Sequence, residues 1–338
     1  MRHPQWEDRR KTVPFGKKSD GTPDFDGTLR GAGGYFGLAN RAPQRLNNGM
    51  GRKLACFGMV PMVLLLFAAA SGMDTTAHSE GTPMIEPVDI KKLRITVIYD
   101  NFGGNEGLRA DWGFSCLIEG LEKSILFDTG LDPAIFSNNM KLLKISPEQV
   151  DLMVLSHEHG DHIGGLPAFF RMRTDLPVWV PSSFSDPVKA YIRQSGAALE
   201  EVDDAPRRIC RQAATLGKMS SGLYWPKEQV LYIATHQGGI VVTGCAHPGI
   251  VKIVERAKSV MGPEILLVMG GFHLATLGEA AIRRIVDDFK RLEVRHAAPC
   301  HCSGVLARRC FQEAYGPRYV DIGVGTVVTA ADLRPASP

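Results

Sequence analysis

The feature that most constrains this chain is a dense group of histidine and acidic residues behind a short apolar run. Residues 151–155 have the length and composition of a buried strand. In residues 156–165, three histidines and two acids fall within six positions, and two glycines end the segment. A helix-like segment over 166–173 follows. We therefore expect the group on a loop at the carboxyl end of a strand, where open α/β sheets bind ligands.

The spacing within this loop predicts a metal site. His157 and His159 are two positions apart, so an extended backbone directs both side chains to one side. Asp161 and His162 are adjacent, so they point apart and can face a second cation. Imidazole and carboxylate ligands suit zinc, iron or manganese. The alternative is a chance cluster, which a chain with ten histidines disfavours. Glu158 lies outside the pattern and is predicted to be solvated.

The charge and cysteine patterns limit the function classes. Residues 1–53 carry eleven Lys and Arg against five Asp and Glu, so the rest of this +3 chain is net negative. No basic stripe favours nucleic-acid binding, and a small-molecule substrate is expected instead. The seven cysteines show no C-x-x-C pair and do not predict a disulfide framework. A hydrophobic content of 44% is sufficient for a sizeable enzyme core.

The amino-terminal region predicts export. Residues 1–49 lack apolar periodicity and are expected to be disordered, or an over-extended gene start ahead of Met50. Residues 50–72 have a basic start, an apolar middle and small residues at the end, which is the layout of a secretory signal peptide. An uncleaved membrane anchor is the alternative, but the run is short and contains Pro61. We expect an exported or periplasmic protein, with a linker over 73–90.

Apolar alternation and capping signals predict a strand-rich body with interspersed helices. Strands are expected over 93–99, 113–119, 124–127, 177–181, 229–234, 239–243, 265–269, 294–298 and 319–328. Helices are expected over 132–143, 186–194, 250–260 and 279–292, and one more before the final strand. Residues 196–226 are predicted to be irregular.

Three later predicted strands are each followed by a histidine. These histidines are His247, His273 and His301. A lone histidine is more often structural than a ligand, but a position at the carboxyl end of a strand favours a role in the site. Cys300 and Cys302 flank His301, and in an extended backbone they point away from it, as small buried residues.

The motif H-x-H-x-D-H, with Asp128-Thr129-Gly130 roughly thirty residues ahead of it, resembles the signature of the metallo-β-lactamase superfamily. Further motifs resemble the branch of that superfamily named for a dihydropterin-ribofuranosylaminobenzene-phosphate synthase. They cover residues 113–115, 126–130, 243–250, 270–274 and 299–304. The resemblance spans about 93–328 and is specific for the branch, whereas a fold or branch does not define a substrate.

The resemblance implies a four-layer αββα sandwich as the catalytic domain over 91–332. It also implies one or two divalent cations, with zinc favoured and iron or manganese as alternatives. The implied metal ligands are His157, His159 and His247 for the first cation, and Asp161, His162 and His301 for the second. Asp128 is implied as a group that braces the metal loop.

One position departs from the family pattern. The strand over 265–269 is followed by His273 where the superfamily has an aspartate that bridges both metals. His273 is therefore expected to bind one metal, to contact the substrate, or to leave the second site weaker, because an imidazole nitrogen binds one cation.

These features predict a metal-dependent hydrolase of an ester, thioester, lactone or phosphoester. Asp161 is expected to bind a second metal or to orient the water, and His273 to contact the developing oxyanion. One alternative is the transferase that joins a dihydropterin pyrophosphate to an aminobenzene ribosyl phosphate, in the cytoplasm. The other is a metal-binding protein without catalysis.

Overall fold

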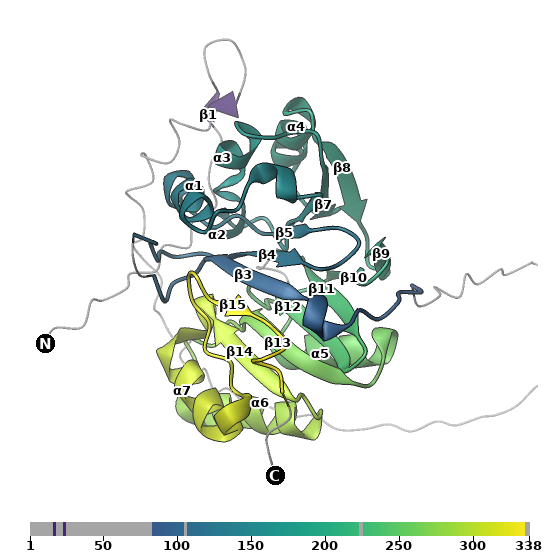
Figure 1. Cartoon of the computed structure of the whole chain (residues 1–338), viewed down its shortest axis with the longest axis vertical. Coiled ribbons are helices and arrows are strands. Elements are labelled where there is room, and N and C mark those ends of the chain that lie inside the picture. The colour runs from purple at the N-terminus through teal and green to yellow at the C-terminus, as the bar shows by residue number, and fades with distance from the viewer. Residues whose placement is uncertain (1–15, 18–22, 25–82, 105–106, 223–225, 335–338) are drawn as a thin grey trace, which may run out of the picture.

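Two mixed sheets stand between two groups of helices in this protein (Figure 1). The computed structural model describes residues 16–17, 23–24, 83–104, 107–222 and 226–334. The expected signal segment 50–72 lies outside the described residues, as does most of 1–49. In the described ranges, no helix is long and apolar enough to cross a membrane.

The first sheet has seven strands and the second has six. The first, in spatial order, contains β15 (Val327–Val328), β3 (Arg94–Tyr99), β4 (Ser115–Glu119), β5 (Ile125–Phe127), β6 (Leu152–Val154), β7 (Pro177–Pro181) and β8 (Ala198–Val202). The second contains β14 (His296–Cys300), β13 (Ile265–Gly271), β12 (Gly238–Thr243), β11 (Glu228–Thr235), β10 (Ala213–Met219) and β9 (Arg207–Cys210). A separate pair, β1 (Gly16–Lys17) and β2 (Pro23–Asp24), precedes them.

The helices cover the outer faces of the two sheets (Figure 1). The first sheet is covered by α1 (Pro133–Leu142), α3 (Leu166–Phe170) and α4 (Asp186–Gln194). The second is covered by α5 (Ile250–Met261), α6 (Glu279–Arg291) and α7 (Gly304–Tyr315). A single helical turn, α2 (Gly160–Ile163), lies within the loop over 156–165 and carries Asp161 and His162.

Alternation along the strands explains this layering, because successive side chains of a strand point to opposite faces. In β5, Ile125 and Phe127 pack between the sheets, whereas Leu126 packs under the first helical layer. In β13, Leu267 and Met269 join the central core, and Val268 packs against the second helical layer. Strands that are apolar on both faces therefore require a layer on each side. The result is the αββα sandwich that the resemblance implied.

The parallel parts of both sheets end at the same side of the molecule. Strands β5 to β8 run parallel in the first sheet, and β12 to β14 run parallel in the second. The expected ligands follow β6, β12 and β14, and Asp128 follows β5. Because the carboxyl ends of parallel strands share one edge, residues far apart in sequence converge there.

The prediction that residues 196–226 are irregular is wrong, because the segment contains the whole of β8, β9 and β10. Glu200 and Glu201 lie on the edge strand β8, where half-exposed charged side chains hide the alternation of a strand. Position 217 in β10 also requires a glycine. Its φ is +83°, and an added Cβ would lie 2.2 Å from the Asp204 carbonyl oxygen. The structure interrupts the register there, between Thr215 and Lys218.

The last predicted strand and the predicted linker also differ from expectation. The final strand predicted over 319–328 is reduced to β15, and a 3₁₀ turn (Gly316–Arg318) precedes the extended segment. The described end of the predicted linker packs on the second sheet, where Val88 donates its N–H to the Ala234 carbonyl at 2.9 Å and is 7% exposed.

Phe289 is expected to be a large contributor to stability. Its ring lies 5.5 Å from that of Phe272 and 5.1 Å from that of Phe311, beneath the second helical layer. Phe289→Ala should lower the free energy of unfolding by about 3–5 kcal/mol, because it opens a cavity among these rings. Urea denaturation measures the change. Val305→Ala on α7, where Val305 is 72% exposed, is the control and should change stability by less than about 0.5 kcal/mol.

Candidate metal centre

Three imidazole nitrogens from two sheets form the first half of the site. His157 Nε2, His159 Nδ1 and His247 Nε2 lie 3.2 Å from one another, in an equilateral triangle. In tetrahedral coordination with bonds of about 2.0–2.1 Å, ligand nitrogens lie about 3.3–3.4 Å apart. The triangle therefore fits one divalent cation. The structure brings together the three residues that the sequence assigned to the first metal.

Hydrogen bonds behind the rings decide which nitrogen faces the centre. Ser156 Oγ lies 2.8 Å from His157 Nδ1 and donates to Asp128 Oδ2 at 2.7 Å. Because the Ser156 proton is used on the carboxylate, its oxygen accepts from His157 Nδ1–H. The Nε2 lone pair of His157 then points into the triangle. Such outer contacts set the tautomer of metal-binding histidines.

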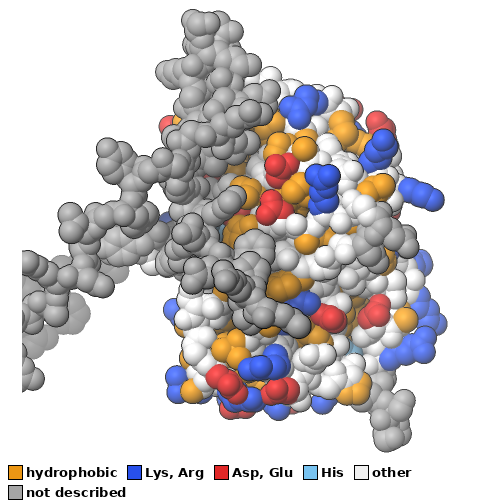
Figure 2. Space-filling view, turned by 90° about the vertical axis from the view of Figure 1, so that its left-hand side faces the viewer, with side chains coloured by type: hydrophobic (Ala, Val, Ile, Leu, Met, Phe, Trp, Pro, Cys, Tyr) orange, Lys and Arg blue, Asp and Glu red, His pale blue; other side chains and the backbone are white. Residues whose placement is uncertain are grey.

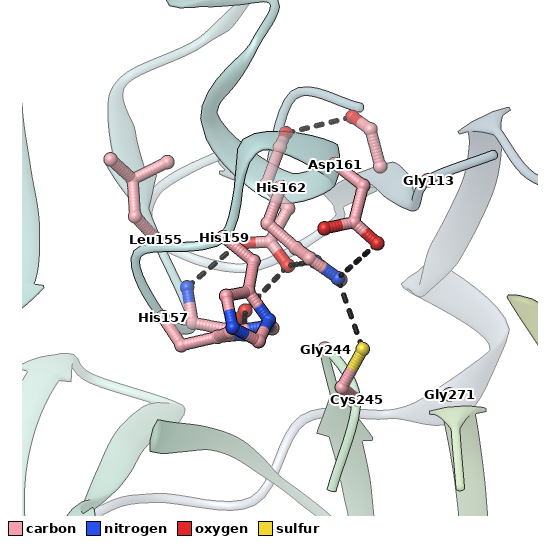
Figure 3. Close-up of polar contacts among 12 residues, drawn as sticks. Gly113, Leu155, His157, His159, Asp161, His162, Gly244, Cys245 and Gly271 are labelled. Carbon is pink, nitrogen blue, oxygen red and sulfur yellow. Dashed lines mark hydrogen bonds and ion pairs between the residues drawn. The ribbon is translucent and has the colours of Figure 1, made fainter. Parts of the chain in front are cut away.

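A second group of ligand atoms lies beside the triangle (Figure 3). His301 Nε2 is 3.3 Å from Asp161 Oδ2, and His162 Nε2 is 3.7 Å from the same oxygen. Asp128 Oδ2 lies 2.7 Å from His162 Nδ1, and Asn101 Oδ1 lies 2.9 Å from His301 Nδ1. These outer acceptors leave both Nε2 atoms facing Asp161. The sequence predicted this trio as the ligands of a second metal.

Asn101 was missed by the sequence analysis, although its role is clear from its contacts. Its Oδ1 accepts the backbone N–H of Gly113 at 2.9 Å, which establishes that the oxygen, not the amide nitrogen, faces His301. The residue sits in a polar loop after β3, and only the fold brings it near a histidine 200 positions later.

The first three histidines are held neutral. Burial, together with the neighbouring histidines, places the pKa of His157 and of His247 well below the ordinary value. Burial also lowers the pKa of His159 to about 4. Neutral imidazoles are the form that binds a metal, so the triangle is ready to bind a cation at physiological pH.

The second group has the opposite electrostatics. Burial alone would lower the pKa of His162, but the carboxylates of Asp161 and Asp128 raise it to about 9. Burial alone would raise the pKa of Asp161, but His162 and His301 hold it far below its usual range. A proton on His162 thus compensates the carboxylates, and a metal cation would replace that proton.

A buried glutamate shapes the loop that carries His247. Glu228, at the start of β11, is fully buried. One carboxylate oxygen accepts the N–H groups of Gly244, Cys245 and Ala246 at 3.0–3.1 Å, and the other accepts that of His247 at 2.8 Å. Four donors on one carboxylate curl the backbone, and Ala246 takes a positive φ of 58°. The sequence analysis did not identify Glu228.

Close packing explains why residue 244, in the loop that carries His247, is a glycine. A Cβ on Gly244 would lie 2.1 Å from Ser156 Oγ and 3.1 Å from Asp128 Oδ2. The two ligand loops therefore approach each other through this glycine, and no larger residue fits.

His273 lies at the edge of the site. Its ring centroid is 4.6 Å from that of His247, and its φ is 56°. It shares a group of candidate ligand atoms with Cys245 and Cys302, all within 4.8 Å. The ring is half-buried, whereas His157 and His162 are fully buried. His273 is thus near enough to contact a molecule bound at the triangle.

Two expectations about neighbouring residues need correction. Glu158 is half-buried rather than solvated, because its carboxylate accepts hydrogen bonds from the backbone and hydroxyl of Ser185, the residue before α4. The backbone at His301 is not extended, since His301 begins a 3₁₀ turn with a φ of 46°. Cys300 and Cys302 are buried as expected, but the turn brings Cys302 Sγ close to the site.

The residue most clearly missed is Cys245. Its Sγ lies 3.2 Å from His162 Nε2 (Figure 3). The same sulfur lies 3.3 Å from His301 Nε2. It also belongs to a group with His157 and His247 in which all ligand atoms lie within 4.8 Å. The spacing C-x-H, two residues before His247, was the available signal.

Strand-end ligands on a double sheet define the class of this protein. The chain belongs to the metallo-β-lactamase superfamily, whose family model matches residues 113–255. Within it, the chain is 28% identical over 287 residues to the 7,8-dihydropterin-6-methyl-4-(beta-D-ribofuranosyl)-aminobenzene-5'-phosphate synthase of Methanocaldococcus jannaschii. That match covers 71% of this chain and 97% of the synthase. A second, uncharacterised protein of the same organism is 31% identical over 228 residues, which cover 59% of this chain and 86% of that protein.

Solved structures show the same fold. A metal-dependent hydrolase of the β-lactamase superfamily matches with a TM-score of 0.60 and 27% identity, over 70% of this chain and 98% of its own. The metallo-β-lactamase fold protein YhfI of Bacillus subtilis matches with a TM-score of 0.52 and 16% identity, over 70% of this chain and 99% of its own.

Asp128→Asn is expected to weaken metal binding without unfolding the protein. If the amide nitrogen replaces Oδ2, it donates to His162 Nδ1 and forces the proton of that ring onto Nε2, toward the cation. Loss of such an outer partner typically costs about 10–100-fold in metal affinity. Chelator competition measures the affinity. Asp132→Asn at the start of α1 is the control, because asparagine caps a helix as well as aspartate does.

Glu228→Gln is expected to lower both thermal stability and metal retention. One half of an amide cannot accept the backbone N–H groups of residues 244–247, so buried donors lose their acceptor at about 1–3 kcal/mol each. A melting curve and metal analysis after gel filtration measure the two effects. Glu255→Gln, on the half-exposed side of α5, should leave both unchanged. An unaltered metal content in Glu228→Gln would contradict the role given to this carboxylate.

Proposed function

We propose that this protein is a metal-dependent hydrolase that acts on an ester, thioester, lactone or phosphoester. The observation that carries the proposal is the triangle of His157, His159 and His247 nitrogens at 3.2 Å spacing. Similarity to a solved metal-dependent hydrolase of the same superfamily supports it. Zinc is the favoured cation, with iron and manganese as alternatives, because the donors are imidazoles and a carboxylate.

A divalent cation at this site would supply a Lewis acid and lower the pKa of a coordinated water toward neutrality. The residues of the chain account for the remaining requirements. Asp161 stays ionised because His162 and His301 hold its pKa low. Its carboxylate borders the triangle and can bind a second cation, or accept a hydrogen bond from the attacking water and orient it.

The burial of the site residues favours one side for substrate entry. His157, His162 and His301 are at most 1% exposed and form the floor of the site. His159, Asp161, His247 and His273 are only partly buried and form its open side. A substrate therefore approaches over these four residues. His273, whose ring centroid lies 4.6 Å from that of His247, would donate a hydrogen bond to the oxygen that becomes negative during attack.

Charged side chains of both signs are mixed on one face of the molecule. On the face drawn in Figure 2, Lys and Arg side chains alternate with Asp and Glu side chains and with apolar ones. A small substrate that is recognised mainly at the metal centre suits such a surface.

A transferase is the second candidate function. The match to the dihydropterin synthase spans 97% of that enzyme, so the two chains share their full domain. Such a transferase would form product only when both of its substrates are present. A hydrolase would release product from one ester and water, which separates the candidates in one assay.

His247→Ala is the sharpest test of the proposed function. Removing one corner of the triangle should lower hydrolysis by more than about 100-fold, beyond the loss typical of an outer residue. Metal content should fall at the same time. Elemental analysis and an assay panel of esters, thioesters, lactones and phosphodiesters measure the two effects.

The control for this variant is His236→Ala. His236 is exposed at the β11–β12 turn, away from the strand ends that carry the site. It should retain full metal content and rate. A wild-type protein that holds no metal after growth with zinc, iron or manganese would refute the proposed function.

A further inference from the structure

The second half-site lacks the strand-end aspartate that the family pattern supplies, because His273 follows β13 instead. Asp161, His162 and His301 contribute three ligand atoms, and the end of β13 has no carboxylate to add. A tetrahedral cation takes a fourth ligand, either from the protein or from water. Cys245 Sγ lies within the same group, with all four atoms no more than 4.8 Å apart.

We propose that the Cys245 thiolate is a ligand of the cation held by Asp161, His162 and His301, in the role of the missing strand-end aspartate. The inference rests on the proposed metal centre. Its distances fit: Sγ is 3.2 Å from His162 Nε2 and 3.3 Å from His301 Nε2. A cation with a sulfur bond of about 2.3 Å and a nitrogen bond of about 2.0 Å holds the two atoms roughly 3.5 Å apart.

The hydrogen-bond pattern favours a cation over a simple thiol contact. Asn101 and Asp128 occupy the Nδ1 atoms, so the Nε2 atoms of His162 and His301 both face Cys245. Without a cation, these contacts need both the extra proton on His162 and the S–H proton. A cation at the centre satisfies both rings, the Asp161 carboxylate and the sulfur together, because all four can donate an electron pair to it.

The surroundings hold this sulfur in place. The backbone N–H of Cys245 is bound to Glu228 at 3.0 Å, and the residue is 3% exposed. The neighbouring Cys302 directs its own Sγ to the Cys245 carbonyl at 3.7 Å. Cys302 Sγ also lies within 4.8 Å of Cys245 Sγ and of a ring nitrogen of His273, but only the Cys245 sulfur belongs to the group with Asp161, His162 and His301.

The sulfur also borders the first triangle. Cys245 forms a second group with His157 and His247 in which every ligand atom lies within 4.8 Å of the others. The side chain thus stands between the two half-sites. This position couples the second cation to the first through one residue of the His247 loop.

A thiolate changes which metal the second half-site selects. Thiolate ligands favour zinc, cobalt or iron, whereas carboxylate and water ligands suit manganese and magnesium. The wild-type centre should therefore prefer zinc or cobalt over manganese at the second position. Cys245→Asp should restore a carboxylate and raise the share of bound manganese at least tenfold in a competition with zinc.

Cobalt spectroscopy tests the bond itself, independently of activity. Wild-type protein reconstituted with two equivalents of cobalt(II) should show the near-ultraviolet charge-transfer absorption of a thiolate on cobalt. Cys245→Ser should lose that absorption and the second cobalt. Cys245→Asp should lose the absorption but retain both ions, which separates loss of the ligand from loss of the fold.

Two other cysteines provide the controls. Cys302→Ala and Cys310→Ala, the latter buried on α7, should both retain the absorption. Absorption that survives in Cys245→Ser, or that disappears in Cys302→Ala alone, would overturn the assignment. Cobalt bound without any charge-transfer absorption would also overturn it and would leave the proposed hydrolase intact. A wild-type chain that binds no metal would refute both.

Discussion

The buried carboxylate of Asp128 is the contact on which the centre depends. It accepts the backbone N–H and the hydroxyl of Ser156 and lies against His162 Nδ1, with all three distances at 2.7 Å. Through Ser156 it also determines the tautomer of His157. A charged group without solvent exposure is costly unless it is fully hydrogen-bonded, so these contacts leave the loop little freedom.

Glu228 is the counterpart of Asp128 in the second sheet. Each is a buried carboxylate that holds the backbone of one ligand loop, and the two loops meet at Gly244. The ligands therefore stand on backbone that is constrained before any cation binds. Metal centres of this kind depend on the groups behind the ligands as much as on the ligands themselves.

Much of the fold could be predicted because the strands are apolar on both faces. The strand over 177–181 and the helix over 186–194 match β7 and α4 residue for residue. Prediction failed at the sheet edges. The charged side chains of β8 and the bulge in β10 break the alternation of apolar and polar residues that marks a strand. Both segments form strands because they pair with a neighbouring strand, not because of local propensity.

The sequence alone identified the strand ends that carry His157, His159, Asp161, His162, His247 and His301, because a motif of ligands behind an apolar strand is a local signal. Tertiary structure decided the rest. Only the fold shows that Cys245 faces His301, that Asn101 orients that histidine, and that Glu228 holds the loop between them. The physical reason is that the direction of a side chain in a loop follows its backbone angles. Contacts from other strands, such as the four N–H groups on Glu228, set those angles here.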